Sequence, residues 1–445
     1  MTLPGFQPDE TRRSWGRVQH GPQQIAIPQF RDDVAPLLRA ARDAAMPVLG
    51  VGLGRSYGDS GLNLGAAVVD ATRLDRTIAF DPVQGVLRAE AGMALGDILK
   101  LVVPRGWFLP VSPGTRFVTL GGAVANDVHG KNHHSRGTFG TWVRRIGLLR
   151  SDLGMVEVSQ EQHPELFRAT IGGLGLTGFI LWVEFQLVPI ASAWLEQENI
   201  PFGRLSDFFA IAAASEAFEH TVAWVDCTSG GKELGRGIFQ RANWARDGRL
   251  AVHAERAHLA LPVDLPGWAL NRFILRAFNS FHYHANRFKP RRTKLHYGSA
   301  LYPLDAIRNW NRLYGSRGFY QYQCVIPPVA AQDAVHELLR IIAASGMGSF
   351  LIVLKTFGSS RSPGLLSFPH EGTTLALDFA NHGEETLRLM ARLDEVVMSA
   401  SGRLYPAKDG RIPPAIFRAC YPNLDLFRHS MDPAFSSSFW QRISS

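Results

Sequence analysis

A glycine-rich segment near the N-terminus, "GVGLGRSYGDSG" (Gly50 to Gly61), has the composition of a phosphate-binding loop. Glycine lets the backbone approach a ligand closely, and exposed backbone N–H groups bind anions. The spacing excludes a Rossmann fingerprint, because Arg55 and Tyr57 stand where its third glycine should fall. The residues after the loop are poor helix formers, so an extended run of backbone N–H groups would hold the phosphate.

Two further glycine clusters favour a long ligand with two phosphates. "PGTRFVTLGGAVANDVHGKNHH" (Pro113 to His134) contains Gly121 and Gly122 followed by small residues, and "GGLGLTGFI" (Gly172 to Ile180) leads into a strand. A structural hairpin or Ω-loop would explain the first segment taken alone. Three backbone-exposing segments in one region suit a dinucleotide better.

Histidines in the second cluster could indicate a metal site, but the required pattern is incomplete. His129 and His133 stand four residues apart, with His134 adjacent. Gly130 would break a helix between them, and no glutamate follows the first histidine as it does in HExxH zinc sites. We therefore expect no metal, and the simplest interpretation of these histidines is a structural role with satisfied hydrogen bonds.

Two other segments could bind a sugar or an anion. The strand-like "FYQYQCVIP" (Phe319 to Pro327) places Gln321 and Gln323 on one face, where two amides could bind sugar hydroxyls or simply form an exposed sheet surface. "RFKPRRTK" (Arg287 to Lys294) has five positive charges in eight residues. Such a run is either a solvated loop or a contact for a polyprenyl phosphate or an anionic bilayer. No recognisable nucleic-acid-binding module accompanies it.

These segments must be positioned by a framework of helices and strands. Periodicity predicts an amphipathic helix over Arg31–Met46 and a second helix over Ala94–Gly106 that ends at proline and glycine. The same reading predicts strands over Pro47–Gly52, Ala66–Thr72 and Gly85–Gly92, and a buried strand within Leu174–Leu187.

The amino-acid composition of the chain changes at about residue 191 and again at about residue 402. Glycine thins out and aromatic residues become more frequent after the first point, whereas turns and prolines return after the second. We therefore predict an α+β fold. Its first domain would span residues 1–191, an inserted α+β domain with an antiparallel sheet would span 192–402, and the segment 403–445 would return to the first domain.

Composition and charge limit the functional classes. The 445 residues are 46% hydrophobic, which suits a folded protein, and the net charge of +8 favours anionic partners. Cys227, Cys324 and Cys420 are too scattered for a disulfide framework, which indicates a reducing compartment. The N-terminus lacks the apolar core of a secretory signal, and no long apolar run occurs. We therefore expect a soluble cytoplasmic protein without a transmembrane helix.

The order of these motifs resembles the FAD-binding domain of the vanillyl-alcohol oxidase type, or PCMH type, which includes sugar lactone and alditol oxidases. A closer resemblance is to the decaprenylphosphoryl-β-D-ribose oxidase family, the flavin half of an epimerase system that makes the arabinose donor for bacterial envelope glycans. That resemblance spans nearly the whole chain. It rests on "GRSYGD", "HGKNHH", "FYQYQCVIP", "LIVLKTFG" (Leu351 to Gly358), "LLSFP" (Leu365 to Pro369), "LDFA" (Leu377 to Ala380) and "LYPAKDGR" (Leu404 to Arg411).

The resemblance implies which residues bind the cofactor and the substrate. The FAD-binding residues would be Gly52, Gly54, Arg55, Ser56, Tyr57, Gly58, Asp59, Gly114, Thr119, Gly121, Gly122, Asn126, His129, Ile180 and Tyr405. The substrate-binding residues would be Lys131, Gln321, Gln323, Lys355 and Lys408, and the catalytic candidates would be Lys408, His129 and Tyr57. A lysine with an ordinary pKa of about 10.4 is a poor base at neutral pH. Lys408 would therefore need a lowered pKa to accept a proton, or it would stay charged and stabilise a developing alkoxide.

Two positions depart from the families that the chain resembles. Many covalent flavin oxidases have a histidine just before the serine of the first loop, where this chain has Arg55. We therefore predict that FAD is bound without a covalent bond. Some ribose oxidases have a cysteine in the strand before "DF", where this chain has Ala376, so a thiol there is not needed for turnover.

The resemblance implies FAD-dependent oxidation of the ribose 2′-hydroxyl of a polyprenylphosphoryl-β-D-ribose to the 2′-keto sugar. A separate short-chain reductase would then complete the epimerisation, and contact with the membrane would be peripheral. One alternative is an alditol or D-arabinono-1,4-lactone oxidase that uses oxygen. Another is a basic, non-catalytic protein that binds polyanions or membranes, which would leave the three glycine clusters without a role. No nucleic-acid partner is expected.

Overall fold

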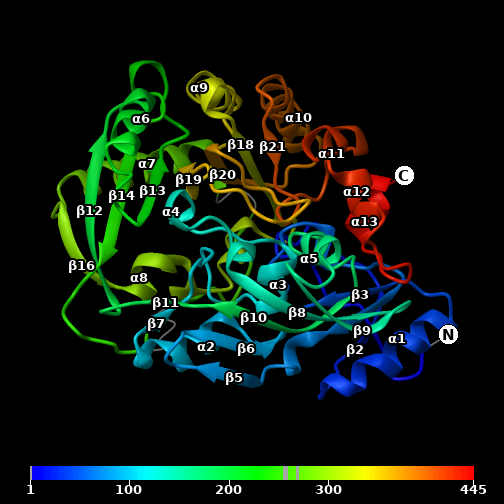
Figure 1. The fold of residues 1–445 in the computed structure, drawn as a ribbon. Helices are drawn as coiled ribbons and strands as arrows, with labels where there is room; N and C mark the ends of the chain where they lie inside the picture. The colour runs from blue at the N-terminus through cyan, green and yellow to red at the C-terminus, as the bar shows by residue number, and fades with distance from the viewer. Residues whose placement is uncertain (1–2, 254–258, 267–269, 445) are drawn as a thin grey trace.

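The N-terminal part of the chain forms two sheets and the helices that connect them (Figure 1). The structure is a computed structural model that describes residues 3–253, 259–266 and 270–444. A four-stranded sheet has the order β1-β2-β4-β3, in which β4 runs parallel to both of its neighbours. Its strands are β1 (Gln7–Asp9), β2 (Gln23–Ala26), β3 (Val48–Val51) and β4 (Ala67–Asp70).

The second sheet is antiparallel and has the order β5-β6-β10-β8-β9. Its strands are β5 (Thr77–Asp81), β6 (Val86–Glu90), β8 (Val143–Arg150), β9 (Gly154–Ser159) and β10 (Phe179–Gln186). The short strands β7 (Trp107–Phe108) and β11 (Val188–Pro189) pair separately. The helices of this part are α1 (Val34–Asp43), α2 (Leu95–Val102), α3 (Leu120–Ala125), α4 (His133–Arg136) and α5 (Pro164–Thr170).

The predicted elements of this part form, with shorter bounds. The helix expected over Arg31–Met46 begins as a 3-10 turn at Arg31 and continues as α1. The three short strands correspond to β3, β4 and β6. The buried strand expected within Leu174–Leu187 begins only at Phe179, because Gly175 and Gly178 adopt positive φ angles that suit turns.

An eight-stranded antiparallel sheet dominates the rest of the chain, with the order β16-β12-β14-β13-β19-β20-β18-β21. Its strands are β12 (Trp194–Phe202), β13 (His220–Val225), β14 (Gly237–Trp244), β16 (Arg292–His296), β18 (Phe319–Ile326), β19 (Ile352–Phe357), β20 (Gly372–Ala380) and β21 (Arg403–Leu404). Two-residue strands β15 (Leu259–Ala260) and β17 (Ile307–Arg308) pair in parallel beside it. Together the sheets and helices confirm the predicted α+β class.

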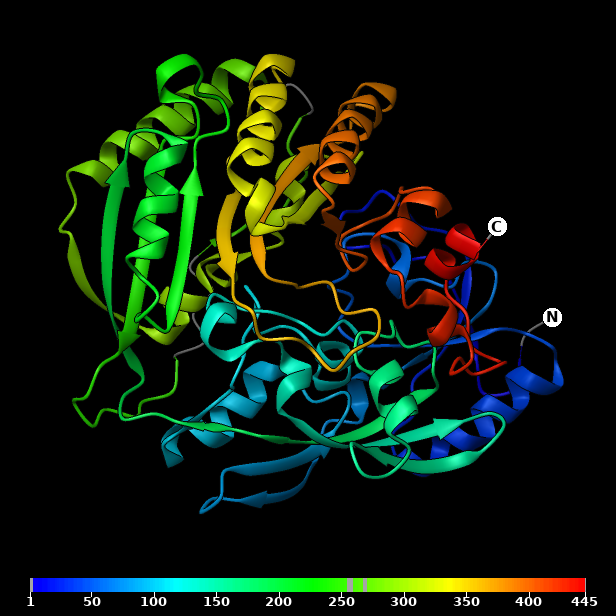
Figure 2. The same cartoon turned by 45° about the horizontal axis from the view of Figure 1, so that its top comes forward.

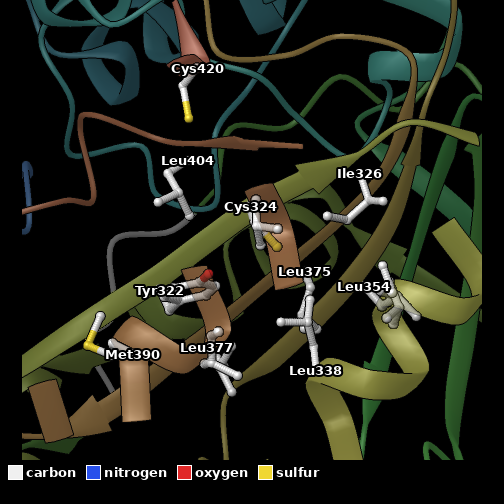
Figure 3. Packing of buried hydrophobic residues seen from close by; sticks show 14 of the residues in the cluster. Tyr322, Cys324, Ile326, Leu338, Leu354, Leu375, Leu377, Met390, Leu404 and Cys420 are labelled. Atoms are coloured by element: carbon white, nitrogen blue, oxygen red, sulfur yellow. The ribbon is translucent and has the colours of Figure 1, made fainter. Parts of the chain in front are cut away.

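Helices α6 (Leu205–Ala213), α9 (Pro328–Ser345) and α10 (Glu384–Ser399) pack on the large sheet and stand out at the top of Figure 2. Tyr322 and Cys324 of β18 point into the apolar core that these helices close (Figure 3). Gln321 and Gln323 alternate with them, so both amides lie on the opposite face of the sheet, as the sequence pattern predicts.

The C-terminal segment packs back onto the N-terminal sheets. Phe435 forms a β-bridge with Val48, and the carboxylate of Asp432 binds the backbone N–H and the hydroxyl of Ser151. Its helices are α11 (Pro414–Cys420), α12 (Leu424–Arg428) and α13 (Ser438–Ser444). The strand β21, by contrast, belongs to the large sheet. The domain boundaries at residues 191 and 402 stay predictions.

Helices α7 (Arg272–Arg287) and α8 (Tyr297–Leu301) flank the edge strand β16 in the sequence.

In the part of the chain that the structure describes, no helix has the length and apolar character needed to cross a bilayer. The three cysteines are buried and carry free thiols.

Candidate active site

Lys408 lies on a turn that packs against the first glycine-rich loop. The backbone N–H of Tyr57 donates to the carbonyl of Ala407 at 3.0 Å. A Cβ atom added at Gly58 would lie 1.5 Å from the carbonyl oxygen of Asp409. Gly58 is therefore required by the contact between these two segments, which holds Lys408 beside the loop.

Arg442 of α13 connects both segments to the C-terminal helices. Its guanidinium donates to both carboxylate oxygens of Asp59, at 2.8 and 2.9 Å, and to Asp409 at 2.9 Å. Asp59 is a predicted FAD-binding residue whose side chain is thus engaged within the protein. Its backbone is the part that remains for a ligand contact.

Lys408 has the properties of a base at neutral pH. Its ammonium nitrogen lies 3.9 Å from the centre of the Tyr57 ring. Burial lowers the pKa of Lys408 to about 7, although the attraction of Asp378 opposes this shift. A large share of Lys408 is therefore uncharged near pH 7 and can accept a proton. Burial raises the pKa of Tyr57 well above its usual value, so that phenol stays protonated.

Asp378 of β20 is a site residue that the sequence reasoning missed. Its buried carboxylate accepts hydrogen bonds from the Gln321 amide at 2.7 Å and the Tyr314 hydroxyl at 3.2 Å. Burial raises the pKa of Asp378 to about 7, against the attraction of Lys408. The available signal was an aspartate inside the apolar strand segment "LDFA", because an acidic residue is rarely buried without a partner.

His129 is held as a neutral donor. The side-chain amide of Gln323 donates to its Nε2 atom at 3.0 Å, and Nδ1 has no hydrogen-bond partner among the described residues. Burial, with help from the nearby Lys355, lowers the pKa of His129 well below its usual value. The ring is therefore uncharged, and its proton resides on Nδ1, where it is available to a ligand.

Lys131 and Lys355 line a pocket of about 120 Å³ together with His129 and His220. The pocket lies between β13, β19 and the loop that contains Gly114. It therefore joins two predicted FAD-binding positions, Gly114 and His129, to two of the predicted substrate-binding lysines.

The two pocket lysines have no neutralising carboxylate among the residues that the structure describes. Lys131 donates to the carbonyl of Ala300 at 2.6 Å, and the Lys355 nitrogen lies 3.5 Å from the carbonyl of Gly130. Burial lowers the pKa of Lys131 to about 8 and that of Lys355 to about 7, and no acidic group among the described residues counteracts either shift. A pocket with two such cations is suited to an anion, whose charge would offset their burial.

Replacing Lys355 with methionine should stabilise the ligand-free protein and change its pH dependence. The folded-state pKa of Lys355 is about 7, against 10.5 in the unfolded chain. The unfolded state therefore binds more protons between these values, and the contribution of Lys355 makes stability rise with pH across that window. Lys355→Met should remove this contribution and raise the melting temperature most at pH 7 and below. Thermal unfolding from pH 6 to pH 10, with exposed Lys232→Met as the control, would check both effects. An unchanged pH slope would contradict the assigned shift.

The predicted FAD-binding glycines fall into two groups. A Cβ atom added at Gly54, which has a φ of +63°, or at Gly114 would meet nothing within 4 Å. A Cβ atom at Gly52 would lie 2.2 Å from the Thr119 hydroxyl, and one at Gly121 would lie 2.8 Å from a protein methyl group. Gly54 and Gly114 thus border open space, whereas Gly52 allows the loop to pack on Thr119 and Gly121 allows α3 to pack on Ala91, which follows β6.

Other predicted cofactor residues gather around α3. Thr119 caps the helix by accepting the backbone N–H of Gly122 at 3.2 Å. The Tyr405 hydroxyl donates to the carbonyl of Asn126 at 3.0 Å, where the helix ends. The remaining ones are Arg55, whose guanidinium lies 4.1 Å from the Trp15 ring centre, Ser56, whose carbonyl accepts the Trp15 backbone N–H, and Ile180, which is buried in β10.

Asp127 is a second residue that the sequence reasoning missed. It has a positive φ of 40° and no exposed surface. Its carboxylate accepts the backbone N–H of Gly140 at 2.8 Å and the hydroxyls of Ser362 and Ser367. Asp127 therefore fixes the turn that presents His129.

The histidine cluster does not assemble with metal-ligating partners in the described residues, which contain no group of three or more His, Cys, Asp or Glu placed to hold a metal. His134 contacts the carbonyl of Phe218 at 2.7 Å. Both ring nitrogens of buried His133 lack a hydrogen-bond partner among the described residues. The expectation that these histidines are structural and satisfied is therefore wrong for His133, which instead packs on Phe357 with ring centres 4.3 Å apart.

Comparison with known proteins agrees with this geometry. Residues 22–159 match the FAD binding domain family. The chain is 35% identical to the decaprenylphosphoryl-β-D-ribose oxidase of Mycolicibacterium smegmatis, over 98% of both chains. It is also 34% identical to an uncharacterised protein of Streptomyces coelicolor, over 79% of this chain and all of that protein. A putative D-arabinono-1,4-lactone oxidase of Neurospora crassa is 27% identical, over 41% of this chain and 33% of its own length. The protein is thus an FAD-dependent oxidoreductase, and the chain belongs to the decaprenylphosphoryl-β-D-ribose oxidase family.

Proposed function

We propose that this protein oxidises the ribose 2′-hydroxyl of a polyprenylphosphoryl-β-D-ribose to the 2′-keto sugar. The observation that supports this proposal most is the pocket lined by His129 and two buried lysines, Lys131 and Lys355, which suits an anion. The full-length similarity to an oxidase of that name supports the same substrate, whereas similarity to the lactone oxidase covers less than half of the chain.

The residues of the site have distinct proposed roles. FAD, when bound, would accept the hydride that leaves the C2′ carbon. Lys408 in its uncharged form accepts the hydroxyl proton as the ketone forms, with Tyr57 packed against it. Gln321 and Gln323 bind sugar hydroxyls from one face of β18. Lys131 and Lys355 bind the phosphate.

The residues present fit a flavin dinucleotide. Gly54 and Gly114 border open space that a ligand can enter, and the unpartnered Nδ1 of His129 offers a buried donor. Thr119 and Tyr405 hold the two ends of α3, whose residues Gly121 and Gly122 would help to hold the cofactor. In this arrangement Arg55 occupies the position where a histidine would attach FAD covalently.

FAD should therefore be released intact when the protein is denatured. Arg55 cannot form the bond that histidine forms, and all three cysteines are buried and lie outside the three glycine-rich segments of the sequence. Acid precipitation should leave the yellow colour in the supernatant and a colourless pellet. Colour that stays with the pellet would show a covalent attachment and refute the prediction.

A direct substrate comparison tests the function. The purified protein should reduce its flavin with prenylphosphoryl ribose under anaerobic conditions but not with free alditols or aldonolactones. Mass spectrometry should detect a sugar that has lost two hydrogen atoms. Turnover of D-arabinono-1,4-lactone alone would favour the alternative oxidase and contradict the proposal.

The 2′-keto product requires a second enzyme to complete an epimerisation. Reduction of the ketone from the opposite face would give the arabinose configuration, and we assign that step to a separate short-chain reductase. The lipid part of the substrate also implies contact with a membrane surface. The basic run Arg287–Lys294 supports a peripheral contact with anionic lipid, although Arg292 and Lys294 are paired with Glu198 and Asp247.

A further inference from the structure

Helix α7 packs on the large sheet through one narrow face. Leu275, Asn279 and Tyr283 are buried and follow a spacing of four residues. The Asn279 amide donates to the carbonyl of Ser349 at 3.0 Å, and the Tyr283 hydroxyl lies 3.3 Å from the carbonyl of Phe202. This face fixes the orientation of the helix and directs the opposite face toward solvent.

The outward face of α7 and its C-terminal end carry large aromatic side chains. Phe273, Phe281 and Phe288 are 69%, 73% and 83% exposed, and we call these three residues the α7 aromatic stripe. Ile274 and Phe278 beside them are also exposed. Large apolar side chains gathered on one exposed helix face mark an interaction surface, because burying them releases free energy.

The charge around the stripe has a single sign. Residues 272–294 contain seven basic residues and no aspartate or glutamate. They are Arg272, Arg276, Arg287, Lys289, Arg291, Arg292 and Lys294, all of them exposed. Only Arg292 and Lys294 form ion pairs within the described parts of the chain. The other five cations are therefore available to a negatively charged surface.

Helix α7 and the pocket contact the same face of β13. His220, Val222 and Trp224 alternate along β13 and so point the same way. His220 and Val222 line the pocket, whereas the Trp224 ring contacts His282 of α7 with centres 4.5 Å apart. A path along this face therefore leads from the phosphate-binding lysines to α7.

We propose that α7 docks in the surface of an anionic phospholipid bilayer, with the aromatic stripe among the acyl chains and the flanking cations on the head groups. The polyprenyl chain then stays in the bilayer while its phosphate and ribose reach the pocket. This assignment rests on the proposed lipid-linked substrate. A bilayer fits better than a protein because a run of uncompensated cations calls for a continuous negative surface, and aromatic insertion needs no matching pocket.

Vesicle sedimentation tests the proposal directly. The holoprotein should bind vesicles of phosphatidylcholine with phosphatidylglycerol in a salt-sensitive way and bind pure phosphatidylcholine weakly. Replacing Phe273, Phe281 and Phe288 with serine should reduce binding about a hundredfold, since each partly inserted phenylalanine contributes roughly a factor of five. The matched control replaces three exposed apolar residues outside α7, Val83, Leu153 and Val329, with serine and should bind like the parent.

A charge variant separates the electrostatic attraction to head groups from the insertion of the phenylalanines. It also controls for misfolding. Reversing Arg276, Arg287 and Arg291 to glutamate should abolish the preference for anionic vesicles, while bound FAD and melting temperature stay those of the parent. The proposal is overturned if the parent does not bind anionic vesicles, or if the stripe variant binds like the parent. Stripe-dependent self-association or binding to a reductase without vesicle binding would also overturn it and assign the face to a protein.

Activity distinguishes this inference from the proposed function. A short-chain, water-soluble prenylphosphoryl ribose should reduce the flavin of the parent and the stripe variant at equal rates, whereas a long-chain substrate in anionic vesicles should react more slowly with the variant. If neither protein oxidises any prenylphosphoryl ribose but the parent still binds vesicles through α7, the proposed substrate fails and the docking surface stands. Equal rates on the vesicle-bound substrate would count against a role of α7 in substrate delivery.

Discussion

Lys408→Ala is expected to slow flavin reduction by prenylphosphoryl ribose about 10²–10⁴-fold, the range of a positioned acid–base group. Burial lowers the pKa of the Lys408 amine to about 7, so its uncharged form can accept the hydroxyl proton at neutral pH. The variant should stay folded and keep its FAD, because the turn around Lys408 is held by backbone bonds to the glycine loop and by Arg442.

Rapid anaerobic mixing measures this effect as the rate of flavin bleaching. In the parent, that rate should rise with pH through about 7, because the uncharged amine is the active form above its pKa. Lys408→Met, which keeps the contact with Tyr57, should be as slow as the alanine variant and lose this pH dependence. Exposed Lys232→Ala is the matched control. If Lys408→Ala bleaches at the parent rate, the base lies elsewhere and His129 becomes the leading candidate.

Lys131→Met is expected to weaken substrate binding roughly tenfold to a hundredfold, which corresponds to the loss of a charge-assisted hydrogen bond to phosphate. Within the described residues, the Lys131 ammonium donates a hydrogen bond to a backbone carbonyl and pairs with no carboxylate, so its charge is available to an anion. The maximal rate of flavin reduction should change little, because Lys131 does not contact the reacting hydroxyl in the proposed arrangement.

Measuring the rate of flavin reduction at increasing substrate concentrations separates the dissociation constant of the substrate from the limiting rate. The dissociation constant should rise while the limiting rate stays within a few-fold of the parent. Ribose without a phosphate should bind the parent and the variant equally weakly. An equal loss of affinity for that uncharged sugar would mean that Lys131 acts on the shape of the pocket and not on the phosphate.

The glycine loop shows what the local sequence could predict, a close approach to the backbone, and what it could not, the partner at each glycine. Its composition indicated a segment whose backbone something approaches closely, and the structure shows such an approach at Gly52 and Gly58. The partner differs from one glycine to the next: Gly58 meets Asp409 and Gly52 meets Thr119, whereas Gly54 borders open space. Spacing along the chain does not distinguish these cases, because each partner belongs to a segment remote from the loop.

By itself, the sequence determined the short strands, the amphipathic first helix, the alternation of Gln321 and Gln323, and the order of motifs that indicated a flavin oxidase. These features depend on periods of a few residues or on residue identity. Only the tertiary structure revealed Asp378, the unpartnered Nδ1 of His129 and the lowered pKa values of Lys131, Lys355 and Lys408. The reason is that burial and charge pairing are properties of neighbours in space. At this site those neighbours come from β13, β18, β19, β20 and the glycine loops, which are separated by up to hundreds of residues along the chain.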